Sequence, residues 1–145
     1  MKIMKTAIYP GSFNPIHEGH QQVIDLALQI FDKVIVVIAV NPKKEKPTID
    51  DFNNRKKLIE SIYGDKVKII CYYGLVGQFA KENDACIIKG VRNFIDFQNE
   101  LDQASFNRSM FGVETILVPS APELNFISST LMRELKTYDE NITKS

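Results

Sequence analysis

The sequence is short of cysteine, net charge and long apolar runs, and each shortage excludes a class of protein. Its 145 residues include two cysteines, no tryptophan, and 18 basic against 18 acidic side chains, so the formal net charge is zero. A neutral chain argues against a general nucleic-acid binder, which carries a basic excess or stripe. The longest aliphatic run, VIVVIAV at 34–40, is far too short to span a membrane. No secretory apolar region precedes Pro10, so we expect a cytoplasmic protein with no membrane partner.

The two cysteines, Cys71 and Cys86, each lie inside an apolar stretch. Such cysteines are typically reduced core residues, and we expect neither a disulfide nor a redox pair. A zinc site would need more ligands at closer spacing, so the sequence predicts no metal ligands of its own.

Apolar runs of strand type alternate with amphipathic segments along the whole chain. The pattern predicts strands over 3–9, 34–40, 66–73, 85–89 and 113–119, with helices over 18–31, 50–63, 75–83, 95–110 and 128–136. The run 34–40 has no polar alternation, which is typical of a strand covered on both faces. We therefore expect a single doubly wound, Rossmann-like α/β domain over 1–145, with a five-stranded parallel sheet. In such a sheet, ligands bind beyond the carboxyl ends of the strands.

For the helix expected over 95–110, the plain alternative to a functional role is a merely amphipathic helix. Its apolar residues Ile95, Leu101 and Phe106 would face the core. Its polar residues would lie on the surface, as Asp96, Glu100, Asn107 and Arg108.

The segment YPGSFNPIHEGH at 9–20 follows the first strand and leads into a helix. Pro10 and Gly11 should end the strand sharply, and Gly19 lies next to His20 near a helix start, where an anion is favoured. Ser12 and His20 can donate hydrogen bonds to a phosphate there. The zinc-protease pattern H-E-x-x-H fails, because Gln21 follows His20, and G-x-G-x-x-G and P-loop patterns are absent. The plain alternative is a tight turn with a capping histidine.

Three later loops of the predicted sheet carry further candidates for anion binding. Lys43, Lys44 and Lys46 follow the second strand, although a solvated loop explains any one of them. Lys89, Gly90 and Arg92 place two cations around a glycine before a helix. Hydroxyls cluster at the last helix start, in Ser128, Ser129 and Thr130 with Arg133 one turn later, where capping alone needs one serine.

Taken together, H-x-G-H after the first strand and ISST-x-x-R before the last helix resemble the nucleotidylyltransferase superfamily. Within it, YPGSFNPIHEGH, KGVRNFIDFQNELDQASFNR and FISSTLMREL are similar to the bacterial phosphopantetheine adenylyltransferase family, and the resemblance spans nearly the whole chain. It implies an enzyme of coenzyme A biosynthesis that converts ATP and 4′-phosphopantetheine to dephospho-coenzyme A and pyrophosphate with Mg²⁺. The acceptor phosphate would attack the α-phosphorus of ATP directly, and the chain would assemble as a homohexamer.

The resemblance also implies roles for individual residues. His20 would stabilise charge on the α-phosphate, Ser12 would contact both substrates, and Phe13 would lie beside the nucleotide. Lys44 and Lys89 would bind the acceptor, with Val76 lining its channel. The nucleotide would be held by Gly90, Val91, Arg92, Glu100, Leu124, Asn125, Phe126, Ile127, Ser128, Ser129 and Thr130.

Three positions depart from the family pattern. His17 replaces the usual threonine and is more typical of cytidylyltransferases in the same superfamily, Asn14 replaces an aspartate, and Lys89 replaces an arginine. The alternatives are therefore another nucleotidylyltransferase, such as a glycerol-3-phosphate cytidylyltransferase, or a non-catalytic nucleotide-binding regulator.

Overall fold

A computed structural model of the chain describes residues 5–39, 48–120 and 133–139. Strands and helices alternate through it, as the sequence pattern predicts. In chain order they are β1 (Thr6–Gly11), α1 (Glu18–Ile30), β2 (Lys33–Ala39), α2 (Ile49–Tyr63), a short 3-10 turn (Gly64–Lys66), β3 (Lys68–Tyr72), α3 (Val76–Glu82), β4 (Cys86–Val91), α4 (Phe94–Phe111) and β5 (Thr115–Pro119). Residues 133–139 are helical, and the earlier part of the helix expected over 128–136 lies outside the described residues.

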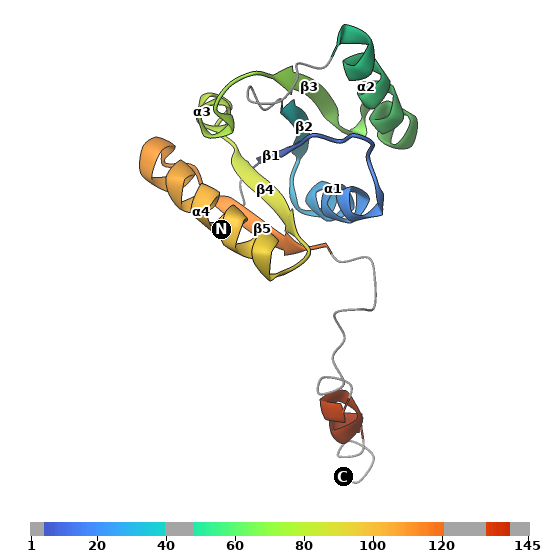
Figure 1. Cartoon of the computed structure of the whole chain (residues 1–145), viewed down its shortest axis with the longest axis vertical. Coiled ribbons are helices and arrows are strands. Elements are labelled where there is room, and N and C mark those ends of the chain that lie inside the picture. The colour runs from blue at the N-terminus through green and yellow to red at the C-terminus, as the bar shows by residue number, and fades with distance from the viewer. Residues whose placement is uncertain (1–4, 40–47, 121–132, 140–145) are drawn as a thin grey trace.

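All five strands run parallel, in the order β3-β2-β1-β4-β5, which confirms the predicted doubly wound sheet (Figure 1). The strand order reverses at β1, because the chain first builds outward through β2 and β3 and then returns to add β4 and β5. That reversal marks the place where such folds bind ligands.

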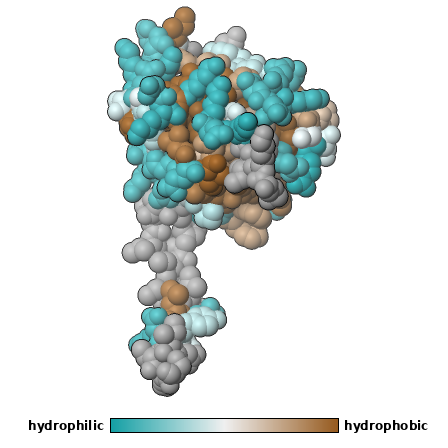
Figure 2. Space-filling view, turned by 180° about the vertical axis from the view of Figure 1, so that it is seen from behind, coloured by the Kyte–Doolittle hydropathy of each residue, from teal (hydrophilic) through white to brown (hydrophobic). Residues whose placement is uncertain are grey.

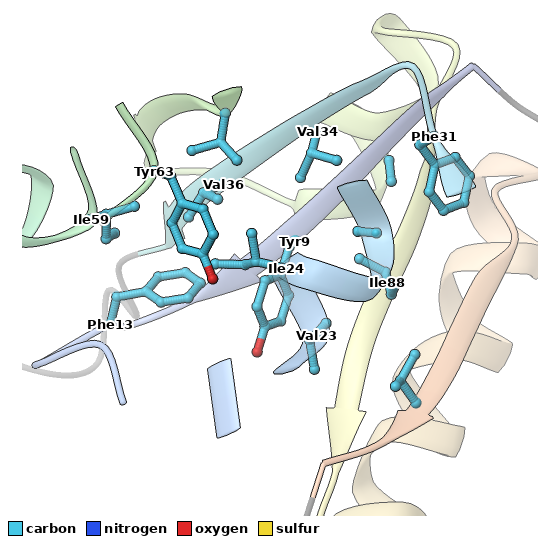
Figure 3. Packing of buried hydrophobic residues seen from close by; sticks show 14 of the residues in the cluster. Tyr9, Phe13, Val23, Ile24, Phe31, Val34, Val36, Ile59, Tyr63 and Ile88 are labelled. Atoms are coloured by element: carbon cyan, nitrogen blue, oxygen red, sulfur yellow. The ribbon is translucent and has the colours of Figure 1, made fainter. Parts of the chain in front are cut away.

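Helices cover both faces of the sheet (Figure 1). One face packs Val34, Val36 and Ile38 of β2 against residues of α1 and α2, among them Val23, Ile24 and Ile59 (Figure 3). The other face packs Ile35 and Val37 against α3 and the end of α4, among them Ala80, Phe79 and Phe111. The strand β2 is therefore buried on both sides, as its unbroken apolar run predicts.

The helix α4 reverses the orientation that its amphipathic pattern suggests. Ile95, Leu101 and Phe106 are 74%, 41% and 47% exposed, so the prediction that they face the core is wrong. The face turned toward the sheet instead carries the less exposed residues Asp96, Glu100, Ala104, Asn107 and Phe111. Their spacing of four, four, three and four residues places them on one side of a helix. The half-buried side of α4 therefore includes polar groups, and much of the apolar surface of this helix faces solvent.

The first strand continues through Pro10 and ends at Gly11, so the expectation that Pro10 ends it is wrong. The carbonyl oxygen of Pro10 accepts a hydrogen bond from Lys89 of β4, so it points to the β4 side. The N–H and C=O of one strand residue point the same way, and the N–H that proline lacks is therefore one that would have paired with β4. Pro10 remains paired in register with Val37 of β2.

The two cysteines are free thiols, as predicted. Cys71 lies on β3 and Cys86 on β4, with β2 and β1 between those strands. Burial raises the pKa of both thiols, which favours the protonated form.

Hydrophilic residues cover most of the face seen in Figure 2, with hydrophobic residues showing between them. Across the part of the chain that the structure describes, no helix is long and apolar enough to cross a membrane.

Candidate active site

The strands β1 and β4 separate at their carboxyl ends. They pair only at Ala7 with Cys86 and Ile8 with Ile87, although β1 continues to Gly11 and β4 to Val91. The side chain of Lys89 bridges the resulting opening, and its Nζ donates to the carbonyl oxygen of Pro10 over 3.4 Å. A crevice therefore forms where the strand order reverses.

Two pockets adjoin this crevice. The first, here called the His20 pocket, has a volume of about 320 Å³. It is lined by Tyr9, Pro10, Gly11, Ser12, Asn14, Pro15, His17, Gly19, His20, Lys89, Gly90, Arg92, Asp96, Glu100 and Ser120. The second, here called the Val76 pocket, measures about 240 Å³ and is lined by Pro10, Gly11, Ser12, Ala39, Val76, Ile87, Lys89, Glu100, Gln103, Ala104, Asn107 and Thr115. The two pockets share the end of β1, together with Lys89 and Glu100.

The loop after β1 is anchored by Phe13, whose side chain is fully buried. Its φ of 48° lies in the left-handed region, which a bulky residue adopts only where the surroundings enforce it. The ring packs edge-on against Tyr9, with centroids 5.3 Å apart, and near Ile59 of α2 (Figure 3). Arg55 of α2 adds a second tie, because its Nη1 donates to the carbonyl oxygen of Ser12 over 3.3 Å. Ser12 is thereby held at the mouth of both pockets.

The helix α1 begins with a reciprocal capping arrangement between His17 and His20. Nδ1 of His17 accepts from the backbone N–H of Gly19, and Nδ1 of His20 accepts from the backbone N–H of His17, each over 3.1 Å. The two rings stack with centroids 3.6 Å apart. The plain alternative of a capping histidine is therefore right for both residues, and it gives His17 a structural reason to replace a threonine.

This cap also sets the chemistry of His20. Because Nδ1 accepts a hydrogen bond, the neutral ring carries its proton on Nε2. Burial, followed by the nearby His17, Arg92 and Lys89, lowers the pKa of His20 to about 4. At neutral pH the ring is an uncharged donor at the wall of the pocket.

The described residues of the His20 pocket carry two cations and two carboxylates, arranged as two pairs. Nζ of Lys89 lies 3.4 Å from Oε1 of Glu100, and Nε of Arg92 lies 3.0 Å from Oδ2 of Asp96. The first pair is the more enclosed, with side chains 22% and 16% exposed. Each cation keeps donors to spare for a bound anion.

The structure brings together six of the residues that the sequence nominates: Ser12, His20, Lys89, Gly90, Arg92 and Glu100 all line the His20 pocket. Val76 lines the other pocket, together with Ser12, Lys89 and Glu100. Phe13 and Val91 line neither, and the ring of Phe13 is enclosed in the core. Lys44, with its neighbours Lys43 and Lys46, lies outside the described residues, as do Leu124, Asn125, Phe126, Ile127, Ser128, Ser129 and Thr130.

Sequence reasoning missed several lining residues, chiefly Tyr9, Asp96, Ser120 and Asn107. A signal for two of them was present in α4, where Asp96, Glu100, Ala104 and Asn107 recur at helical spacing. Ser120 directly follows β5, so the rule that ligands bind at strand ends could have found it.

Sequence comparison shows close relatives over nearly the whole chain. The cytidylyltransferase-like family matches residues 8–135. A phosphopantetheine adenylyltransferase from Bacteroides thetaiotaomicron is 38% identical over 97% of this chain and 94% of that protein. One of the same name from Thermotoga neapolitana is 36% identical over 95% of this chain and 87% of that protein.

Solved structures share the fold at lower identity. A bifunctional NMN adenylyltransferase/ADP ribose pyrophosphatase from Francisella tularensis, crystallised with AMP and a manganese ion, matches with a TM-score of 0.58 and 22% identity. The match covers 94% of this chain, which spans 42% of that longer protein.

Proposed function

Because this chain belongs to the phosphopantetheine adenylyltransferase family of cytidylyltransferase-like enzymes, we propose that it transfers the adenylyl group of ATP to 4′-phosphopantetheine. The products are dephospho-coenzyme A and pyrophosphate, a reaction of coenzyme A biosynthesis. One observation carries the proposal: Ser12 lines both pockets at the end of β1, and the uncharged His20 lines the first of them. A reaction that joins two phosphate-bearing substrates needs such a junction.

The direct transfer needs fixed donors rather than a protein nucleophile. An oxygen of the acceptor phosphate forms a bond to the α-phosphorus of ATP, and the bond from that phosphorus to the bridging oxygen breaks, releasing pyrophosphate. In this proposal Nε2–H of His20 donates to a non-bridging oxygen of the α-phosphate as charge moves onto it. The neutral ring keeps its proton on Nε2 throughout, because Nδ1 accepts the hydrogen bond from the backbone N–H of His17. This capping bond therefore holds the donor in position.

The binding roles divide between the two pockets. The His20 pocket takes ATP, with Gly90, Arg92 and Glu100 around the nucleotide, and the Val76 pocket takes the pantetheine arm. Lys89 lines both pockets, and this position supports its proposed role in binding the acceptor phosphate. We extend the proposal to the backbone of Phe13 and Val91, to Lys44 for the acceptor phosphate, and to residues 124–130 for the nucleotide.

We propose Mg²⁺ as the divalent cofactor. In the described ranges no group of three His, Cys, Asp or Glu side chains could hold a metal ion, and the carboxylates of Asp96 and Glu100 are each paired with a cation. These residues fit an ion that enters with the nucleotide, held by its phosphate oxygens and water. Bound there, Mg²⁺ would offset the negative charge of the phosphates.

We also propose that residues 1–145 form one nucleotidylyltransferase domain that works in the cytoplasm as a homohexamer. The exposed apolar residues of α4 support an assembly, because Phe94, Ile95 and Met110 are 81%, 74% and 60% exposed.

The reaction is tested by measuring pyrophosphate release with Mg²⁺, pairing ATP or CTP with phosphopantetheine or glycerol 3-phosphate. We expect release only with ATP and phosphopantetheine, and a loss of about 10²–10³-fold in kcat for His20→Ala, which removes the donor. Release with CTP would instead favour a cytidylyltransferase, for which His17 is the sequence argument. Tight ATP binding without release from any pair would favour a regulator.

A further inference from the structure

Tyr9 places a phenol group at the wall of the His20 pocket, near the carboxyl end of β1. Its side chain is only 4% exposed, yet it lines that pocket. Figure 3 shows its ring beside Ile24 and Val23, with the hydroxyl oxygen at the far end of the ring. Among the residues that the structure describes, none forms a hydrogen bond with this hydroxyl.

Tyr63 provides a direct contrast within the same core cluster. It is 7% exposed, and its hydroxyl donates to Oδ1 of Asp25 over 2.9 Å and lies 3.3 Å from the carbonyl oxygen of Gln21. Buried hydroxyls in native proteins are nearly always paired in this way, because an unpaired one loses the hydrogen bonds that it makes in water. The hydroxyl of Tyr9 has no such partner among the described residues and belongs to a side chain that lines the pocket, so a molecule in the pocket can supply one.

The ring of Tyr9 is held in place by its neighbours. It packs edge-on against Phe13, and its centroid lies 6.3 Å from that of His20. Burial, followed by the charge of Glu100, raises the pKa of the phenol well above its usual range. The hydroxyl therefore remains a hydrogen-bond donor at any working pH.

The surroundings of this hydroxyl suit a ligand rather than another side chain. Ser120 is also only 4% exposed and lines the same pocket. A Cβ on Gly90 would lie 2.6 Å from Oγ of Ser120, so the Ser120 hydroxyl can pack against this part of the wall only because residue 90 has no side chain. The pocket also contains His20 and Arg92, which favour an anionic ligand.

We propose that the Tyr9 hydroxyl donates a hydrogen bond to a phosphate oxygen of the nucleotide in the His20 pocket, as a further substrate-contacting residue of the adenylyl transfer. The identity of the ligand as ATP rests on the proposed function. The phenol adds an uncharged, fixed donor beside His20, so it stabilises the bound nucleotide without altering the balance of charge in the pocket.

The test compares Tyr9→Phe with Tyr63→Phe, each of which removes one buried hydroxyl. ATP affinity is measured by calorimetric titration, thermal unfolding gives Tm without ligand, and pyrophosphate release gives kcat and KM. For Tyr9→Phe we expect about tenfold weaker ATP binding with an unchanged Tm, since no hydrogen bond to a residue of the described ranges is lost. For Tyr63→Phe we expect a lower Tm and wild-type ATP affinity.

Wild-type ATP affinity and kinetics in Tyr9→Phe would overturn the proposal. So would a fall in Tm as large as that of Tyr63→Phe, because the hydroxyl would then have a partner within the protein. A wild-type chain that binds ATP and releases no pyrophosphate would contradict the proposed activity alone, since the two affinities can still be compared.

Discussion

His20 is a histidine whose environment keeps it uncharged. Burial and three nearby groups, His17, Arg92 and Lys89, all disfavour its protonated form. A cationic ring would attract phosphate more strongly. It would, however, stabilise the bound substrate and the transition state equally, which does not raise kcat. The neutral donor instead responds to charge that develops during the transfer.

The lowered pKa of His20 predicts an acid-dependent loss of stability. Below pH 6.5 the unfolded chain binds a proton on this residue, whereas the folded chain does so only near pH 4. The contribution of His20 to the free energy of unfolding is therefore fully present above about pH 6.5, and it is lost as the pH is lowered toward 4. Thermal unfolding of wild type and His20→Asn between pH 7 and 4.5 checks this, because the asparagine can still cap α1 but does not titrate. Equal declines in Tm for both proteins would contradict it.

Lys89 is a second residue whose replacement has a predictable effect. Its ammonium bridges Pro10 and Glu100 as a single point charge, whereas arginine offers a planar fork that matches a phosphate group. We expect Lys89→Arg to lower the KM for phosphopantetheine by about threefold to tenfold, with kcat nearly unchanged. Steady-state kinetics with varied acceptor measure this, and Lys56→Arg on the surface of α2 is the control. A higher KM would mean that the crevice is too narrow for a guanidinium.

The sequence indicated which residues line the pocket better than it indicated the backbone conformation of the loop that positions them. The H-x-G-H spacing nominated His20, and the glycine between two cations nominated Lys89 and Arg92; all three line the His20 pocket. The left-handed backbone of Phe13 could not be predicted, because it depends on a core that α2 completes. Tyr9 was missed since a tyrosine within an apolar strand reads simply as core.

At the scale of elements, α4 has its polar side toward the sheet. The pattern of apolar residues identified the helix and its length well, and it failed for the orientation. Periodicity shows which residues share a face, but it cannot show whether that face meets the core, a ligand or another subunit. The inner side contains Glu100 and Asn107 because the two pockets lie beneath it.

The contact between α3 and α4 depends on Gly77. A Cβ there would lie 2.5 Å from the ring of Phe111 and would also overlap the side-chain amide of Asn107. We expect Gly77→Ala to lower the free energy of unfolding by about 1–3 kcal/mol through overpacking, and to raise the KM for phosphopantetheine, since Asn107 lines the Val76 pocket. Urea denaturation and kinetics measure the two effects, with Gln78→Ala on the exposed side of α3 as the control. An increase in stability would show that α3 can shift without cost.

At the scale of the whole molecule, the alternation of strands and helices was sufficient to predict the sheet. Each crossover between parallel strands has one favoured hand, so few arrangements remain once the elements are known. The separation of β1 from β4 was not predicted, because it depends on where two strands distant in sequence stop pairing. Only the missing N–H of Pro10 hinted at it.

The exposed apolar residues of α4 predict an assembly larger than one chain. We expect size-exclusion chromatography with light scattering to give six times the chain mass of 16.5 kDa. Phe94→Asp should reduce that mass, because it places a charge on a residue that is 81% exposed in the single chain. Gln98→Asp introduces the same charge at a polar position of α4 and should leave the mass unchanged. A monomeric wild-type chain would contradict the proposed hexamer.

The short pairing between β1 and β4 has a consequence for motion. The two halves of the sheet are joined by backbone bonds near Ala7 and Ile8, while farther along, a single lysine side chain spans the opening. The carboxyl ends of β1 and β4 can therefore move apart without breaking a backbone hydrogen bond between the two strands. Ile87 and Val91 bond toward β5, so Ile88 and Gly90 face β1. The amide hydrogen of Gly90 should therefore exchange with deuterated water faster than that of Ile88, and bound nucleotide should slow the exchange.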